Sequence, residues 1–387
     1  MRIAMVAPLI ESVPPVHYGG TERVVSVLTE ELVRRGHDVT LFASGDSRTA
    51  AALVPCAARG LRLDGTCRDY LAASMSQLRT VYRRAGDFDV IHNHSDYPAF
   101  PFAVACPRVP TVTTAHGRLD LPEVQQAYRA FGELPLVAIS NAQRATLTGV
   151  NWLATVYHGI EFGHYRFHPD RGDYLVFLGR ICPEKRPDRA IEIARETGRR
   201  LVIAAKVDPV DRSYYEHAIA PLIAQHRHLV EYVGEVNDEE KDALLGGAYA
   251  YLFPIDWPEP FGLTMAEAMA TGTPVVALRA GSAPEVVEDG VTGFVRDSLT
   301  GMIAAIDRIK EIDRRACRAR AERLFSPAAM ADGYERVYSA LASGSVATVA
   351  AKSLVLSPDG HGPVLAGRTA GAAGPWDADA VAAQPGA

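Results

Sequence analysis

The chain has 387 residues, the length of two ordinary domains or of one large one. Hydrophobic residues make up 48% and charged residues 22%, so the composition excludes a wholly disordered chain, a collagen and a coiled coil. The net charge of −6 provides no basic surface for phosphate backbones, and we expect no nucleic-acid partner. No apolar run approaches the ~20 residues of a membrane-spanning helix, so we expect no transmembrane segment and a cytoplasmic protein.

The five cysteines lie far apart in the sequence. Their number is odd, and no C-x-x-C spacing occurs. This pattern indicates neither a disulfide framework nor a zinc ribbon, and we expect reduced thiols that act as small apolar residues.

The first part of the chain alternates between predicted strands and helices. Residues 2–7 read as a buried strand, and residues 21–35 as a helix in which Val24, Leu28 and Leu32 recur every fourth position before Gly36. Further strands are predicted at 39–43, 89–92, 111–114, 136–139 and 155–157. Several of these are apolar throughout, which is typical of a parallel sheet with helices on both faces.

The sequence turns polar and irregular around residues 159–173, and the pattern then restarts. Strands are predicted at 174–178, 201–205, 231–233, 249–254 and 274–278, with helices at 187–197, 239–245 and 264–270. We therefore expect two doubly wound α/β domains, residues 1–165 and 166–325. No sequence repeat relates the two halves.

The end of the chain has two parts. Residues 326–343 follow the second predicted domain. In residues 344–387, 23 of the 44 residues are Ala, Gly or Pro, which predicts a disordered tail.

Ligands of doubly wound sheets bind beyond the carboxyl ends of the strands. Residues 258–268 occupy such a place, because they follow a strand that ends near Phe253 and open a helix. The free N–H groups of a helix start, with Gly262 allowing close approach, make an anion site. Glu259 and Glu267 could accept hydrogen bonds from sugar and ribose hydroxyls beside a phosphate. Alternatively, Thr264 and Glu267 form a capping box, and Glu259 is a polar turn residue.

A second candidate site follows the first strand of the second half. Gly179 frees the end of that strand, and Arg180 and Lys185 could converge on a diphosphate. The alternative is a solvated arginine and a lysine paired with Glu184.

Two further candidates lie in the first half. Gly19 and Gly20 precede its first helix and resemble a phosphate-binding turn, but they match neither G-x-G-x-x-G nor a P-loop, and a plain flexible loop is the alternative. His116 ends a predicted strand, where a neutral imidazole could bind a sugar hydroxyl or serve a structural role.

The evidence for a metal site is weak. His92 and His94 lie on one face of a predicted strand, but no third ligand is evident. The D-x-D strings at 87–89 and 377–379 lie away from the carboxyl edge of a sheet, and we interpret both as chance matches. We expect no metal and no cofactor.

Taken together, these motifs resemble the retaining glycosyltransferases of family 4, which have the GT-B fold of two facing Rossmann-like domains with a deep cleft between them. The resemblance covers about residues 1–342. Its most specific element is E-x7-E, Glu259 to Glu267. The other matching motifs are Gly272-x-Pro274-Val275-Val276, Gly281-Ser282-Ala283-Pro284-Glu285-Val286-Val287, Gly179-Arg180, Glu184-Lys185, Gly19-Gly20 and His116.

The resemblance implies a division of roles. Residues 1–165 would bind the acceptor, through loops around 14–18, 96–102 and 118–131, and residues 166–325 the nucleotide sugar. A last helix at about 326–341, within residues 326–343, would cross back to the first domain. The cleft would close about a hinge near 160–172 and 325. The donor-binding residues would be Gly19, Gly20, Arg180, Lys185, Glu259, Phe261, Gly262, Leu263, Thr264 and Glu267, and the catalytic residues His116, Arg180, Lys185 and Glu259.

The implied reaction is transfer of a hexose-type sugar from a UDP-, GDP- or ADP-sugar to an acceptor hydroxyl, with retention, by front-face attack and without a metal. The acceptor could be a small molecule, a glycan or a lipid-linked sugar. A motif often written Asn-Gly-Ile/Val-Asp is His158-Gly159-Ile160-Glu161 here, so no role is carried over for its first and last residues. The alternatives are a sugar-nucleotide epimerase or hydrolase on the same fold, a non-catalytic homologue that binds sugar nucleotides, and a dehydrogenase, which the sequence before Gly19 disfavours.

Overall fold

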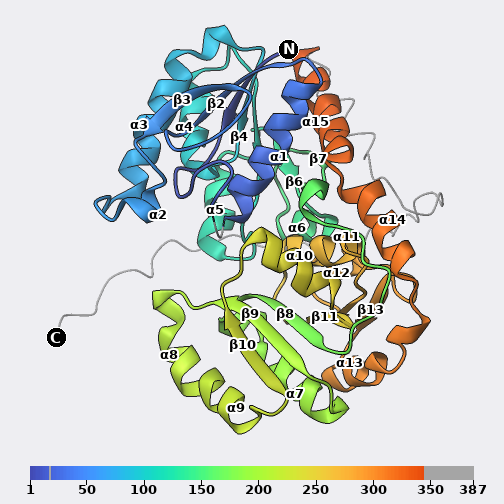
Figure 1. Ribbon diagram of the computed structural model, residues 1–387. Coiled ribbons are helices and arrows are strands. Elements are labelled where there is room, and N and C mark those ends of the chain that lie inside the picture. The colour runs from blue at the N-terminus through green and yellow to red at the C-terminus, as the bar shows by residue number, and fades with distance from the viewer. Residues whose placement is uncertain (17–18, 344–387) are drawn as a thin grey trace, which may run out of the picture. The chain divides into compact units, whose positions relative to one another are not determined.

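The structure is a computed structural model, and it describes residues 1–16 and 19–343. These residues form two separate parallel sheets, one of seven strands in the order β3-β2-β1-β4-β5-β6-β7 and one of six in the order β10-β9-β8-β11-β12-β13 (Figure 1). The expectation of two doubly wound α/β domains is confirmed. The predicted tail, residues 344–387, and the D-x-D string within it lie outside the described residues.

We call the part built on the seven-stranded sheet the first lobe and the part built on the six-stranded sheet the second lobe. The strands of the first lobe are β1 Arg2–Val6, β2 Asp38–Ser44, β3 Ala52–Ala57, β4 Val90–Asn93, β5 Thr111–Thr114, β6 Leu136–Ala138 and β7 Trp152–Thr155. Those of the second are β8 Leu175–Arg180, β9 Leu201–Lys206, β10 Val230–Gly234, β11 Ala250–Phe253, β12 Val275–Leu278 and β13 Gly293–Arg296.

The helices follow the strands in alternation. In the first lobe they are α1 Gly20–Arg34, α2 Leu61–Asp64, α3 Tyr70–Arg83, α4 Phe100–Ala105, α5 Pro122–Ala130 and α6 Asn141–Thr146. The later ones are α7 Pro187–Thr197, α8 Arg212–Tyr214, α9 Ala220–Gln225, α10 Asp238–Gly246, α11 Leu263–Ala270, α12 Ala283–Val286, α13 Leu299–Ile306, α14 Arg314–Phe325 and α15 Pro327–Ala342. Short 3₁₀ or π turns are η1 Ala85–Asp87, η2 Tyr97–Ala99, η3 Phe162–His164, η4 Pro183–Lys185, η5 Pro209–Asp211, η6 Tyr215–Ile219 and η7 Ile309–Glu311.

The first sheet is buried on both faces, as its apolar strands predict. Within β1, Ile3 and Met5 belong to a cluster with residues of α1 and α15, whereas Ala4 and Val6 pack with Leu78 of α3. Successive side chains of a strand point to opposite faces, so one five-residue strand contributes to two cores. The last helix, α15, thereby packs on the first sheet although it follows the second lobe in the chain (Figure 1).

Helix α1 is anchored as its sequence pattern predicts. Val24, Leu28 and Leu32 are fully buried, and the chain leaves the helix through Gly36, whose φ of 84° is the left-handed conformation that glycine adopts without strain. Helix α1 begins at Gly20, near the carboxyl ends of the strands of the first sheet.

Several details differ from the sequence prediction; strand β13, Gly293–Arg296, for example, was not predicted. The last strand of the first sheet is β7, Trp152–Thr155, so the strand predicted at 155–157 is wrong in position. Strand β3 was not predicted; its burial pattern is intermediate or exposed, as befits the edge of a sheet, and it carries Pro55, which lowers strand propensity.

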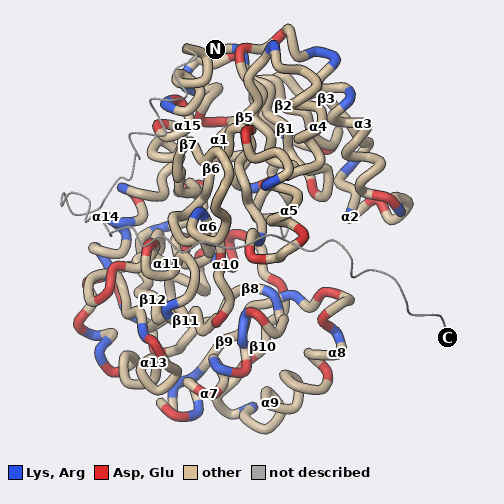
Figure 2. Tube along the Cα trace, turned by 180° about the vertical axis from the view of Figure 1, so that it is seen from behind, with Lys and Arg blue, Asp and Glu red and all other residues tan. Residues whose placement is uncertain are grey.

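The charged residues, the cysteines and the apolarity of the helices agree with the expectations from composition. Acidic and basic residues are interspersed along both lobes (Figure 2). All five cysteines are free, as expected. Within the described residues, no helix combines the length and apolarity needed to cross a membrane.

Candidate active site

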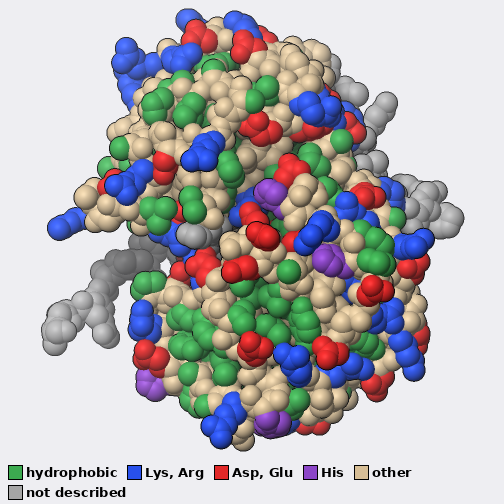
Figure 3. All heavy atoms as spheres, viewed as in Figure 1, with side chains coloured by type: hydrophobic (Ala, Val, Ile, Leu, Met, Phe, Trp, Pro, Cys, Tyr) green, Lys and Arg blue, Asp and Glu red, His purple; other side chains and the backbone are tan. Residues whose placement is uncertain are grey.

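A pocket of about 980 Å³ is lined by residues of both lobes. Where the lobes meet, charged side chains of both signs reach the surface (Figure 3). The lining includes every site residue predicted from the sequence: Gly19, Gly20, His116, Arg180, Lys185, Glu259, Phe261, Gly262, Leu263, Thr264 and Glu267. The fold thus brings together side chains that are up to 248 positions apart in the sequence.

Two helix N-termini face this pocket from opposite lobes. Helix α1 begins at Gly20 and α11 at Leu263, and a Cβ atom added to Gly20 would lie 3.6 Å from the Leu263 side chain. Each helix start presents N–H groups without intrahelical partners and a partial positive charge. Their convergence suits an anionic ligand group between the lobes.

Gly262 is required at the start of α11 for two reasons. Its φ of 75° is left-handed, and a Cβ atom there would lie 2.6 Å from Met265 and 3.0 Å from the Phe253 ring. Glycine at this position is therefore required by the backbone conformation and by the neighbouring side chains, and the close approach of a ligand stays a prediction. The capping-box alternative is wrong: the N-cap is Gly262, and the Thr264 hydroxyl lies 2.6 Å from the Tyr251 hydroxyl.

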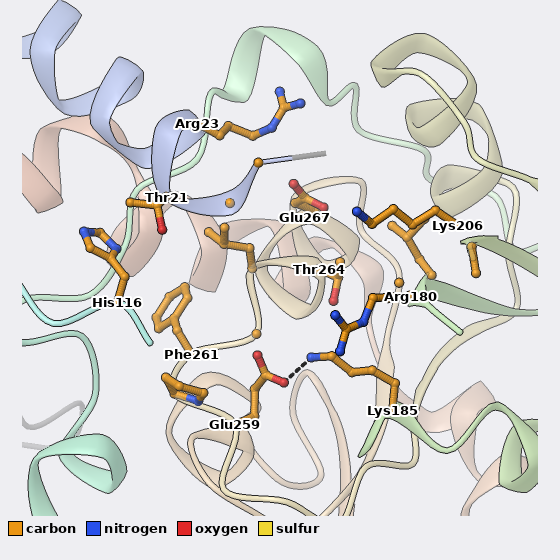
Figure 4. A pocket seen from close by; sticks show the side chains of 18 of the residues that line it. Thr21, Arg23, His116, Arg180, Lys185, Lys206, Glu259, Phe261, Thr264 and Glu267 are labelled. Atoms are coloured by element: carbon orange, nitrogen blue, oxygen red, sulfur yellow. Dashed lines mark hydrogen bonds and ion pairs between the residues drawn. The ribbon is translucent and has the colours of Figure 1, made fainter. Parts of the chain in front are cut away.

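Arg180 lies at the carboxyl end of β8, beside Lys206 on β9 in the sheet register. The Arg180 guanidinium is 3.2 Å from the Asp211 carboxylate, and the Lys206 ammonium is 2.8 Å from that of Asp208. In Figure 4 both basic side chains extend toward the same side of the pocket. Two cations held by carboxylates behind them can bind a diphosphate without a large reorganisation.

Lys185 comes from η4, in the loop after β8. Its ammonium group pairs with the Glu259 carboxylate, and it lies 5.2 Å from the centre of the Trp257 ring (Figure 4). Pairing with Glu184, the alternative from the sequence, is therefore wrong. Lys185 and Glu259 join the two predicted donor-binding loops of the second lobe.

Glu267 lies in α11 and is 4% exposed. Its carboxylate accepts a hydrogen bond of 3.0 Å from the Lys241 ammonium of α10, and Lys241 also pairs with Asp238 at 3.2 Å. Asp238 in turn pairs with Arg23 of α1 at 2.9 Å, across the two lobes. The Glu267 carboxylate is thus buried and paired with a lysine, and it also lines the pocket. There it could accept hydrogen bonds from the hydroxyl groups of a ligand.

The turn at 281–287 supports the loop that carries Glu259. A Cβ atom on Gly281 would lie 2.4 Å from the backbone of Glu259, so only glycine fits there. The Ser282 hydroxyl donates a hydrogen bond of 2.7 Å to the Phe261 carbonyl. Glu285 reaches the first lobe, where its carboxylate accepts hydrogen bonds from the N–H groups of Asn141 and Ala142 at the start of α6, at 2.8 and 2.6 Å.

His116 lies beyond the end of β5 and enters the pocket from the first lobe (Figure 4). Its Nε2 atom is 2.7 Å from Nδ1 of His94, while its own Nδ1 atom is buried without a hydrogen-bond partner among the described residues. Burial lowers the pKa of His116 to about 3, so the imidazole is neutral at physiological pH.

His158 also lines the pocket, and the sequence analysis assigned it no role. Its ring stacks on that of His116 with centroids 5.0 Å apart, and its Nδ1 atom is likewise buried without a partner in the described part of the chain. Burial is the main cause that lowers its pKa well below the usual value. Lys206 was missed as well, although its position at the end of a predicted strand could have indicated it.

The weak metal candidates have structural roles. His92 bonds Tyr338 and Thr114 at 2.7 and 2.8 Å, and Asp89 pairs with Arg2 at 2.6 Å. Across residues 1–16 and 19–343, no group of three or more His, Cys, Asp or Glu side chains is arranged to hold a metal ion.

Comparison with known families decides the class of this site. Residues 18–162 match the model of the glycosyltransferase family 4 domain, and residues 166–323 match that of glycosyl transferases group 1. The chain belongs to glycosyltransferase family 4. The first of these models covers most of the first lobe of this glycosyltransferase, and the second model covers the second lobe.

Curated relatives of this family 4 glycosyltransferase have differing names. A phosphatidyl-myo-inositol mannosyltransferase of Mycolicibacterium smegmatis is 27% identical over 347 residues, covering 81% of this chain and 86% of the relative. A glycogen synthase of Mycobacterium tuberculosis is 28% identical over 387 residues, covering 84% and 91%.

Solved structures establish the GT-B fold of this glycosyltransferase. One is Anabaena HepE in complex with UDP-glucose, with a TM-score of 0.67 and 19% identity over 88% of this chain and all of that one. Two facing parallel-sheet α/β domains, the fold expected from the resemblance, are therefore confirmed.

Proposed function

We propose that this glycosyltransferase moves a hexose-type sugar from a nucleoside diphosphate sugar to an acceptor hydroxyl, with retention of the anomeric configuration and without a metal ion. The observation that carries the proposal is the convergence of Arg180, Lys185 and the N-terminus of α11 in one interlobe pocket. Two basic side chains beside the free N–H groups of a helix start suit a diphosphate better than they suit a neutral ligand.

In this proposal the donor lies along the second lobe. Arg180 and Lys185 bind the diphosphate, together with backbone N–H groups around Leu263 and Thr264. The first turn of α1, with Gly19 and Gly20, approaches the same phosphates from the first lobe. Arg180 ends a strand, the N–H groups open helices, and Lys185 is held by its ion pair with Glu259, so little reorganisation accompanies the reaction.

In this proposal, side chains of the pocket that accept hydrogen bonds contact the hydroxyl groups of the sugar and the ribose. Glu267 accepts hydrogen bonds from ribose hydroxyls, because its buried carboxylate is already oriented by Lys241. Glu259 and His116 contact the transferred sugar from opposite lobes, and Phe261 packs beside them. This arrangement puts the anomeric carbon between the phosphate-binding side chains and the first lobe.

The chemical step breaks the bond between the anomeric carbon and the phosphate oxygen and forms one from that carbon to the acceptor oxygen. Negative charge then builds on the departing nucleoside diphosphate. Fixed cations and helix dipoles stabilise that charge strongly when water is excluded. Arg180 and Lys185 supply the role that a divalent cation would have, which supports a metal-independent reaction.

Retention is proposed to come from attack on the same face that the leaving group departs from. The acceptor hydroxyl lies beside the departing phosphate, which takes its proton. A double displacement would need a carboxylate nucleophile at the anomeric carbon. Glu259 is engaged by Lys185, which supports the front-face route.

The donor nucleotide and the acceptor are left open among the expected classes. HepE, which shares the fold, binds UDP-glucose, so UDP-sugars are the first probes. The names of the two curated relatives refer to unlike molecules, phosphatidyl-myo-inositol and glycogen. Small-molecule, glycan and lipid-linked acceptors all therefore belong in the test.

The decisive experiment starts with a thermal-shift screen against UDP-, GDP- and ADP-sugars, because a ligand of the folded state raises the melting temperature by mass action. The stabilising donor, radiolabelled in its sugar, is then incubated with and without an acceptor extract. Label transferred only in the presence of acceptor supports the proposal. A product formed without acceptor supports an epimerase or hydrolase, and binding without any product supports a non-catalytic homologue.

A further inference from the structure

Four histidine rings run from the core of the first lobe to the pocket. His92 and His94 have centroids 3.9 Å apart, His94 and His116 5.0 Å, and His116 and His158 5.0 Å. His94 follows β4, the strand that lies beside β1 with Met5 opposite His92. A contiguous path of buried imidazoles therefore links β1 to the pocket.

His94 has one partner on each ring nitrogen. Its Nδ1 atom is 2.7 Å from Nε2 of His116, and its Nε2 atom is 3.1 Å from the Met5 sulfur. Desolvation by burial lowers the pKa of His94 and of His116, so each ring is neutral and carries one proton. In a neutral imidazole one nitrogen donates and the other accepts.

The Met5 sulfur determines which nitrogen of His94 is protonated. A thioether has no proton to donate and acts only as an acceptor, so the contact is favourable when Nε2 of His94 carries the hydrogen. Nδ1 of His94 is then an acceptor, and Nε2 of His116 must donate to it. The single ring proton of His116 therefore lies in the hydrogen bond to His94, on the side away from its Nδ1 atom.

The opposite arrangement has two disadvantages. It places a nitrogen lone pair of His94 against the sulfur lone pairs, and it leaves a buried N–H of His116 without a partner in the described chain. Buried N–H groups without partners are rarer in proteins than unsatisfied acceptors.

We propose that Met5 and His94 act as positioning residues that hold His116 in its Nε2–H tautomer, so that Nδ1 of His116 presents a lone pair to a substrate hydroxyl. The ligand group facing His116 is then an O–H donor, whereas a phosphate oxygen, which only accepts, is disfavoured there. The identity of that hydroxyl as part of a sugar substrate rests on the proposed function, but the tautomer does not.

The test is a long-range ¹H–¹⁵N correlation spectrum of the full chain with ¹⁵N-labelled histidine, recorded near neutral pH without substrate. Comparison with His116→Asn assigns the His116 signals. The expected result is a pyrrole-type Nε2 and a pyridine-type Nδ1 for His116. A protonated Nδ1, in either the other tautomer or an imidazolium, would overturn the proposal.

The variant Met5→Leu tests whether the Met5 sulfur causes the preference of His116 for the Nε2–H tautomer. The control is Met302→Leu, because Met302 is a buried methionine of the second lobe. We expect the Nδ1–H form of His116 to rise to a comparable population in Met5→Leu and the spectrum of Met302→Leu to stay unchanged. An unchanged His116 tautomer in folded Met5→Leu would remove Met5 from the proposal. Failure of the chain to use any nucleotide sugar would refute the proposed function but leave these spectra as expected.

Discussion

The ammonium group of Lys185 pairs with the Glu259 carboxylate, and this pair joins the loop after β8 to the loop before α11. Both side chains are largely buried, with 23% and 12% of their surfaces exposed. Each is thus the nearest counter-charge of the other, so replacing one changes the electrostatic environment of its partner. Two predictions follow from that coupling.

Lys185→Ala should lower kcat/KM for the donor by roughly 100- to 1,000-fold, the usual effect of removing one group that stabilises developing charge. Steady-state kinetics with the stabilising donor measure it. Lys310→Ala is the matched control, since Lys310 is exposed in η7 and away from the pocket. Wild-type turnover in Lys185→Ala would count against the assignment.

Glu259→Gln should partly restore donor affinity in a Lys185→Ala background. Without the lysine, a buried carboxylate faces the diphosphate and repels it, and the amide removes that charge. We expect the double variant to bind the donor about tenfold tighter than Lys185→Ala by calorimetry. Additive losses in the double-mutant cycle would mean that the two side chains act independently.

Glu267→Gln should raise KM for the donor by about 10- to 100-fold, the range for losing a hydrogen bond to a charged group, and change kcat less. The reason is that ribose is remote from the bond that breaks. Glu239→Gln, an exposed change in neighbouring α10, serves as the control. A fall in kcat with KM unchanged would place Glu267 at the reacting sugar instead.

Chelation with EDTA should leave transferase activity unchanged, because Arg180 and Lys185 are proposed to stabilise the leaving diphosphate. The assay compares initial rates before and after dialysis against the chelator, with added Mg²⁺ as a second arm. Loss of activity that Mg²⁺ or Mn²⁺ restores would contradict the metal-independent mechanism.

The buried histidines should make the fold sensitive to acid. Burial lowers the pKa of His158 in the folded chain, so below the unfolded value of about 6.5 the unfolded chain binds a proton that the folded chain does not. Stability therefore falls as the pH drops through that value. His158→Asn should reduce the loss of unfolding free energy between pH 7 and pH 5 by about 1 to 2 kcal/mol.

Urea unfolding at the two pH values measures this difference. His228→Asn is the matched control, because it also replaces a histidine but at an exposed position of the second lobe. An equal loss in wild type and in His158→Asn would show that His158 does not contribute to the acid sensitivity.

Much of the fold could be predicted because the apolar positions in the sequence pattern are also the positions that the folded chain buries, and because turn residues mark the ends of the helices. Helix α7 has the predicted bounds, 187–197, since Pro stands at its start and Gly198 follows its end with a left-handed φ of 65°. Strand β3 could not be predicted in this way, because an edge strand need not be apolar throughout.

Many of the residues that line the candidate site could be predicted from the sequence, but the contacts between them could not. Strand-end positions identified Arg180 and His116, because both carboxyl edges face one pocket. The partners of Lys185 and Glu267, and the stacking of His158 on His116, depend on side-chain directions across loops that no spacing rule describes. His158 in particular departs from the residue expected in its motif, so the resemblance offered no role for it.

The central claim is that the second lobe holds a nucleoside diphosphate sugar through Arg180, Lys185 and the start of α11. The most direct measurement is a crystal structure of the chain with the nucleotide sugar that gives the largest thermal shift. The account predicts diphosphate oxygens within hydrogen-bonding distance of the Arg180 guanidinium and the Lys185 ammonium. A diphosphate bound outside this pocket, or one that contacts neither side chain, would contradict it.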